Sequence, residues 1–176
     1  MPLRRNAAGR AWRSHDFRIL RDAARLRAAV TVSVHITTHP LTAHATLSTA
    51  TIGHAFPTGD LFRQAVWEIE IDRRPETLRA VRLTRHYTRA PDGRRTSIAD
   101  TRLPAPGSGP ARTLHLRLPE APVGTRLRWR LVHLRMPDDM AHRFGVSSAD
   151  NRTLVSEGEA YVPGQRSGVA RTTPPP

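Results

Sequence analysis

The chain has 176 residues, no cysteine and a formal net charge of +13 at neutral pH. The lack of cysteine excludes disulfides, thiolate metal sites, a cysteine nucleophile and covalent haem attachment through a Cys-x-x-Cys-His motif. All 28 basic residues are arginine, and the chain is also rich in alanine and proline, which is typical of a codon bias towards G and C.

The positive charge raises the question of a nucleic-acid or anionic-membrane partner. The arginines are spread over the expected strands and loops, and aromatic residues make up only 5% of the chain, so stacking platforms for bases are scarce. Nucleic-acid binding is therefore the weakest of the functions considered. No segment has the ~18 to 20 apolar residues of a membrane span. Residues 1–6 carry charge without a following apolar run, so the chain as given shows no secretory signal.

In chain order, residues 1–14 are expected to be irregular, and apolar residues at helical spacing predict a helix from about residue 16 to residue 30. From Val30 the apolar period changes to two, which predicts strands separated by Pro and Gly turns. A helical turn or two is expected at 137–144. The expected strands lie near 30–36, 43–52, 66–71, 78–87, 114–118, 127–131 and 153–162.

This pattern predicts a mainly β fold, an antiparallel immunoglobulin-like β-sandwich preceded by one N-terminal helix. Three regions follow from it: an N-terminal segment and helix (1–29), the sandwich domain (30–163) and a Pro-ended tail expected to be disordered (164–176).

The segment whose residues best suit a chemical role is Gly53-His54-Ala55-Phe56-Pro57-Thr58-Gly59, which lies between two expected strands. Glycine allows a positive φ and proline makes a rigid turn, so a histidine here has a fixed direction. Such a histidine suits a metal or haem ligand. The alternative is a structural turn in which His54 is hydrogen-bonded to the backbone.

This segment resembles a Gly-His-x-Phe-Pro-Thr-Gly motif in the C-terminal β-sandwich domains of a family of multihaem c-type cytochromes. Three further segments resemble parts of that family in the same order: Ser14-His15-Asp16-Phe17 with the helix after it, Asp100-Thr101-Arg102-Leu103-Pro104, and Leu134-Arg135-Met136-Pro137. Together the matches span roughly residues 10 to 145.

The resemblance implies electron transfer in a full-length parent that carries haem c, with His15 and His54 as candidate axial ligands. It implies a structural role for the motif residues, including Asp100 and Arg102. A haem-bearing region or redox partner protein would contact this domain, and the location would be periplasmic or extracellular. The chain departs from the family because it has no haem-attachment motif, so it binds no cofactor covalently. Its start at Met1-Pro2 resembles a cytochrome cut directly after its last attachment site, which suggests a truncated gene product.

The main alternative is a free-standing, haem-free sandwich that serves as an interaction or structural module. The sequence has no Gly-x-Ser-x-Gly, phosphate-loop, dinucleotide or His-Glu-x-x-His motif, and we do not expect an enzyme. His35 and His39 are four residues apart, which on a strand is about 13 Å, so they are not expected to share a metal. His115 and His133 are expected at solvent-facing or edge positions of strands.

Overall fold

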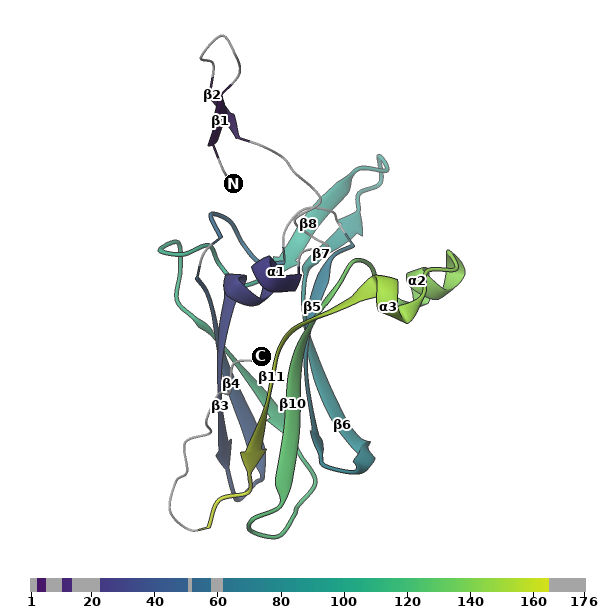
Figure 1. Cartoon of the computed structure of the whole chain (residues 1–176). Coiled ribbons are helices and arrows are strands. Elements are labelled where there is room, and N and C mark those ends of the chain that lie inside the picture. The colour runs from purple at the N-terminus through teal and green to yellow at the C-terminus, as the bar shows by residue number, and fades with distance from the viewer. Residues whose placement is uncertain (1–2, 6–10, 14–22, 51, 58–61, 165–176) are drawn as a thin grey trace.

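A computed structural model describes residues 3–5, 11–13, 23–50, 52–57 and 62–164. Within these residues the two larger sheets are antiparallel and face each other, and two further two-stranded sheets lie outside them (Figure 1). One sheet has four strands in the order β11 (Arg152–Tyr161), β10 (Arg126–Leu134), β5 (Gln64–Ile71) and β6 (Arg74–Leu83). The other has three, in the order β3 (Val30–Thr37), β4 (Thr42–Thr49) and β9 (Arg112–Arg117).

The remaining elements lie mainly at one end of the two sheets, which we call the loop end (Figure 1). Helix α1 (Ala23–Ala29) leads directly into β3 there, and a hairpin of β7 (Arg85–Arg89) and β8 (Arg95–Asp100) follows β6. Two short helices, α2 (Asp138–Arg143) and α3 (Ser148–Asn151), connect β10 to β11. Near the N-terminus, β1 (Leu3–Arg5) pairs with β2 (Ala11–Arg13).

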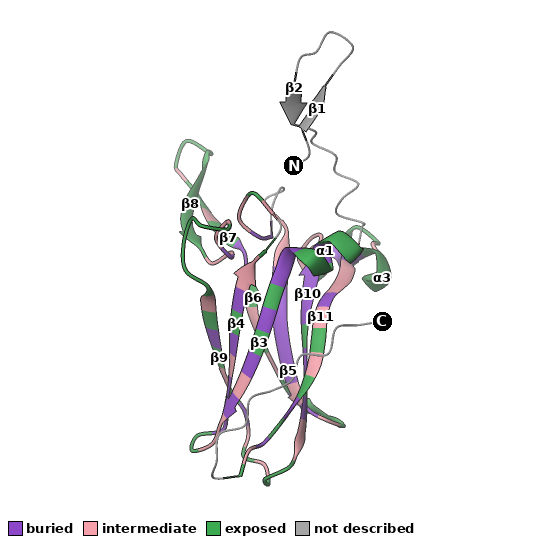
Figure 2. Ribbon diagram, turned by 60° about the vertical axis from the view of Figure 1, so that its left-hand side comes forward, coloured by how far each residue is buried: buried purple, intermediate pink, exposed green. Residues whose placement is uncertain are grey.

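The core lies between the sheets because alternate residues of each strand point inward. In β3 the buried positions are Val30, Val32, Val34 and Ile36, and the residues between them are more exposed (Figure 2). Strand β5, in the interior of its sheet, is buried on both faces over most of its length. One continuous apolar cluster joins both sheets and includes Trp67, Trp129, Phe56 and Leu103.

Gly158 on β11 provides the space for Trp129 on β10. The two residues are directly opposite in the register, and a Cβ atom on Gly158 would lie 2.5 Å from Cζ2 of the indole. That distance is well inside van der Waals contact, so the indole packs against bare backbone. The residue opposite Trp129 therefore has to lack a side chain.

The predicted mainly β antiparallel sandwich is confirmed, with a short helix before its first core strand. Three details of the prediction are wrong. The expected strand 78–87 is two strands, since the chain leaves the four-stranded sheet at Thr84. Residues 95–100 form a strand that was not predicted, because all of its residues are exposed and they show no apolar alternation. The segment 1–14, expected to be irregular, contains the β1–β2 pair.

Candidate functional site

Two of the segments singled out in the sequence meet at the loop end. Phe56 donates its backbone N–H to the carbonyl of Leu103 at 2.9 Å, and Leu103 donates back to the carbonyl of Phe56 at 2.8 Å. Both side chains are buried in the core, 2% and 0% exposed. This isolated bridge joins the Gly-His-x-Phe-Pro segment to the Asp-Thr-Arg-Leu segment, 47 positions further along the chain.

His54 lies two residues before this bridge and is half-buried. Its Nδ1 atom is buried and has no hydrogen-bond partner among the described residues. The structure therefore does not show the backbone hydrogen bond of the alternative interpretation. Gly53 has no positive φ and open space around its Cα, so the conformational reason expected for this glycine is absent. Pro57, which is buried, follows Phe56 through a cis peptide bond.

His133 lies beside the bridge and was not foreseen as part of it. Its ring centroid is 5.9 Å from that of Phe56. It is only 1% exposed, and neither ring nitrogen has a hydrogen-bond partner among the described residues. Burial, with smaller contributions from Arg63 and Arg135, lowers the pKa of His133 to about 4. The expectation that His133 is a solvent-facing or edge residue is wrong, because β10 is buried on both faces from Leu131 to Leu134.

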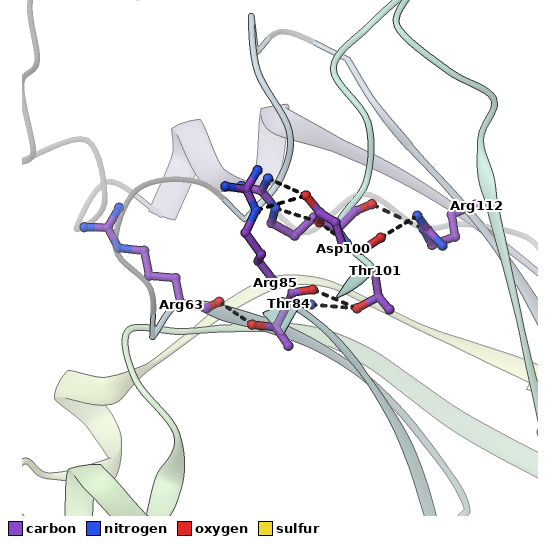
Figure 3. Close-up of polar contacts among 7 residues, drawn as sticks. Arg63, Thr84, Arg85, Asp100, Thr101 and Arg112 are labelled. Atoms are coloured by element: carbon purple, nitrogen blue, oxygen red, sulfur yellow. Dashed lines mark hydrogen bonds and ion pairs between the residues drawn. The ribbon is translucent and has the colours of Figure 1, made fainter. Parts of the chain in front are cut away.

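Asp100 forms the centre of a polar cluster at the base of the β7–β8 hairpin (Figure 3). Arg102 donates to both carboxylate oxygens, from Nε at 2.9 Å and from an Nη at 2.6 Å, and Arg85 on β7 donates to one of them at 3.2 Å. The Arg102 side chain holds the pKa of Asp100 well below its ordinary value. We call Asp100, Arg102 and Arg85 the Asp100 clasp.

Further hydrogen bonds attach the clasp to the rest of the sandwich (Figure 3). Thr101 donates its backbone N–H and its hydroxyl to the carbonyl of Thr84, both at 2.9 Å. The Thr84 hydroxyl donates to the carbonyl of Arg63 at 3.2 Å. Arg112 on β9 donates to the carbonyl of Arg102 at 3.2 Å. The Asp-Thr-Arg-Leu segment thus ties the hairpin to both sheets, which is a structural role.

The structure accordingly brings together some of the predicted site residues. Gly53, His54, Phe56 and Pro57 lie at the same end as Asp100 and Arg102. The candidate ligand His15 lies outside the described residues, as do Thr58 and Gly59 of the motif. His133 could have been found from the unbroken run Leu131-Val132-His133-Leu134, in which a histidine takes the place of an apolar residue.

A haem implied by the resemblance can be tested against the residues present. With no cysteine, this chain makes no thioether bond to haem. His54 is half-buried, and its buried Nδ1 atom has no hydrogen-bond partner among the described residues. This fits a side chain that contacts a group from outside the described chain. Neutral imidazole is a common ligand of haem iron. In the described parts of the chain, no group of three or more His, Cys, Asp or Glu residues is placed to hold a metal ion. No helix among the described residues is long and apolar enough to cross a membrane.

No protein-family model matches the chain, and no curated protein matches it by sequence. Among solved structures, the chain is similar to a penta-heme cytochrome c552 from Thermochromatium tepidum, with a TM-score of 0.61 at 15% sequence identity. The alignment covers 80% of this chain and 41% of the cytochrome chain, so the similarity spans less than half of that cytochrome. What the similarity establishes is a fold shared with part of a multihaem cytochrome.

Proposed function

We propose that this chain is the C-terminal, non-haem-attaching domain of a multihaem cytochrome-like electron-transfer protein. The observation that carries the proposal is the meeting of two cytochrome-like segments at the Phe56–Leu103 bridge, in a fold shared with part of a multihaem cytochrome. The domain itself performs no catalysis. It covers haem groups held by another region or docks a redox partner, and the parent protein is periplasmic or extracellular.

In this proposal the loop end faces the haem-bearing region. His54 is the described residue that would ligate a haem iron, and His15 is the second candidate. A bound haem would supply the redox centre, and the second axial ligand and the thioether bonds would come from the partner region. The role of this chain is to hold one imidazole in place and to exclude water. The buried bridge and the Asp100 clasp fix the backbone next to His54 for that purpose.

The alternative function is a free-standing, haem-free interaction module. It is favoured by the Asp100 clasp, whose carboxylate is bonded entirely by arginines of the same chain and needs no outside partner. Other arginines are also paired internally: Arg130 and Arg152 both bind Glu68, at 2.6 and 2.7 Å. Such pairing takes arginine away from phosphate contacts, so a nucleic-acid-binding function ranks last.

The first test is the genomic sequence upstream of Met1 in the same reading frame. The proposal expects a Cys-x-x-Cys-His codon run that continues into Met1 without a stop. A stop codon or a ribosome-binding site at that place would instead favour the haem-free module.

The second test is spectroscopic. The protein with its upstream region, produced in a host that matures c-type cytochromes, should show a Soret band and low-spin ferric haem signals. His54→Met should change the signal of one haem, while His39→Met, at an exposed turn position, should leave the spectrum unchanged. Identical spectra for the wild type and both the His54→Met and His15→Met variants would remove haem ligation from the proposal.

A further inference from the structure

Three histidines form a row across the outer face of the three-stranded sheet. The register places His35 on β3 opposite His44 on β4, and His44 opposite His115 on β9. Their neighbours along each strand point into the core, so all three rings lie on the side that faces solvent: His35 and His44 are half-buried, and His115 is exposed. This juxtaposition depends on strand register, which a count of residue spacing along one strand does not give.

Two of the three rings are in direct contact. The Nδ1 atoms of His44 and His115 are 2.7 Å apart, and their ring planes are nearly perpendicular at 84°. The ring centroid of His35 is farther away, 6.0 Å from that of His44. The contact therefore belongs to a pair of imidazoles, with His35 beside it.

The contacts of His44 bear on which of its ring nitrogens can bind a metal. The Thr37 hydroxyl lies 2.9 Å from Nε2 of His44, a contact in which either atom can be the donor, and 3.4 Å from the carbonyl of Thr42. In the tautomer that is protonated at Nε2, the Thr37 hydroxyl accepts that proton and Nδ1 of His44 keeps the lone pair that a metal needs. A partner on the far nitrogen is also what orients histidine ligands in metal sites.

We propose that His44 and His115 form a surface site for a late first-row divalent cation such as Cu²⁺, bound through their two Nδ1 atoms. Two nitrogens each about 2.0 Å from a cation, at about a right angle, are about 2.8 Å apart, close to the distance observed. Square-planar or tetragonal nitrogen coordination is typical of Cu²⁺ and Ni²⁺. Water would occupy the other positions, since the described residues place no third protein ligand.

The surroundings select against hard cations. The row has no carboxylate, and Arg117 lies two positions from His115 on the same face of β9. Mg²⁺ and Ca²⁺ need oxygen ligands and are held largely by charge, so imidazole nitrogens beside an arginine do not bind them.

The test is titration of the full chain with Cu²⁺, followed by calorimetry and by electron paramagnetic resonance. One site per chain with two nitrogen ligands is expected. His44→Gln and His115→Gln should each weaken binding by more than the tenfold to hundredfold that loss of an outer-shell partner typically causes. Thr37→Val should weaken it by about tenfold. His39→Gln and His35→Gln, the matched controls, should bind as the wild type does.

Circular dichroism checks that each variant is folded, which is expected because the substituted side chains point away from the core. Retention of wild-type affinity in folded His44→Gln and His115→Gln would overturn the proposal. An equal loss in His35→Gln would overturn the two-histidine assignment. Because the site needs no haem, failure here would leave the cytochrome proposal untouched, and the reverse also holds.

Discussion

The buried His133 should make the stability of the domain depend on pH in a defined window. The perturbation is His133→Leu, which replaces the imidazole by an apolar side chain of similar size. In the folded chain His133 has a pKa of about 4, against 6.5 for an unperturbed histidine. Between these values the unfolded chain binds a proton that the folded chain does not, so stability falls as the pH is lowered from about 6.5 towards 4.

The size of the effect follows from the two pKa values. One pKa unit corresponds to about 1.36 kcal/mol, so the full loss approaches roughly 3 kcal/mol below pH 4. Between pH 7 and pH 5 the expected loss from His133 alone is about 2 kcal/mol. Because neither ring nitrogen has a hydrogen-bond partner in the described structure, His133→Leu leaves no bond broken and should not destabilise the domain at pH 7.

The assay is urea denaturation of wild type and His133→Leu at pH 7, 6 and 5, at constant ionic strength. Carboxylates and the other histidines titrate in both proteins, so the difference between the two isolates His133. The difference should favour the variant increasingly as the pH falls, by about 2 kcal/mol at pH 5 relative to pH 7. A difference that stays constant with pH would refute the assignment of a buried, neutral imidazole at this position.

Four further substitutions test the packing of the sandwich and its loop end by denaturant unfolding at pH 7, and one of them is also tested at acid pH. Gly158→Ala places a methyl group against Trp129 and should cost roughly 1–3 kcal/mol, while Gly53→Ala, with open space around it, should change stability by less than about 0.5 kcal/mol; equal effects would contradict the close packing. Phe56→Ala removes a buried ring and should cost about 3–5 kcal/mol, and a loss below about 1 kcal/mol would show that the bridge is not part of the core. Asp100→Asn should cost about 1 kcal/mol, since the carboxylate is partly exposed to solvent. The wild-type carboxylate has a lowered pKa, so its contribution is present above about pH 4 and is lost as the pH falls below it; an Asp100→Asn variant with the same acid limb as wild type would contradict this.

Most of the sheet strands could be predicted because one face of each strand is buried and the other is exposed. Apolar and polar residues therefore alternate along segments such as 30–36. The prediction failed where burial is not one-sided. The end of β10 is buried on both faces, whereas the prediction assumed one exposed face, so His133 was wrongly expected to face the solvent. The strand β8 is exposed at every position, and its sequence has no alternation of apolar and polar residues.

For the candidate site, local motifs predicted which segments matter but not what each side chain does. The meeting of Phe56 with Leu103 and of His44 with His115 joins residues far apart in the chain, and such pairs depend on register and topology. Asp100 and Arg102, two residues apart, bind each other, which is a local interaction. The unpartnered nitrogens of His54 and His133 became evident only in the folded chain.

The anchoring of the β7–β8 hairpin has a consequence for how this domain can vary. Arg85 and Asp100 close the hairpin where it leaves the sandwich, and the bridge at Leu103 fixes the chain as it re-enters the core. The turn at 91–93, at the far end of the hairpin, is exposed and is isolated from the core by these bonds. Length and sequence at that tip are thus free to diverge without loss of the fold.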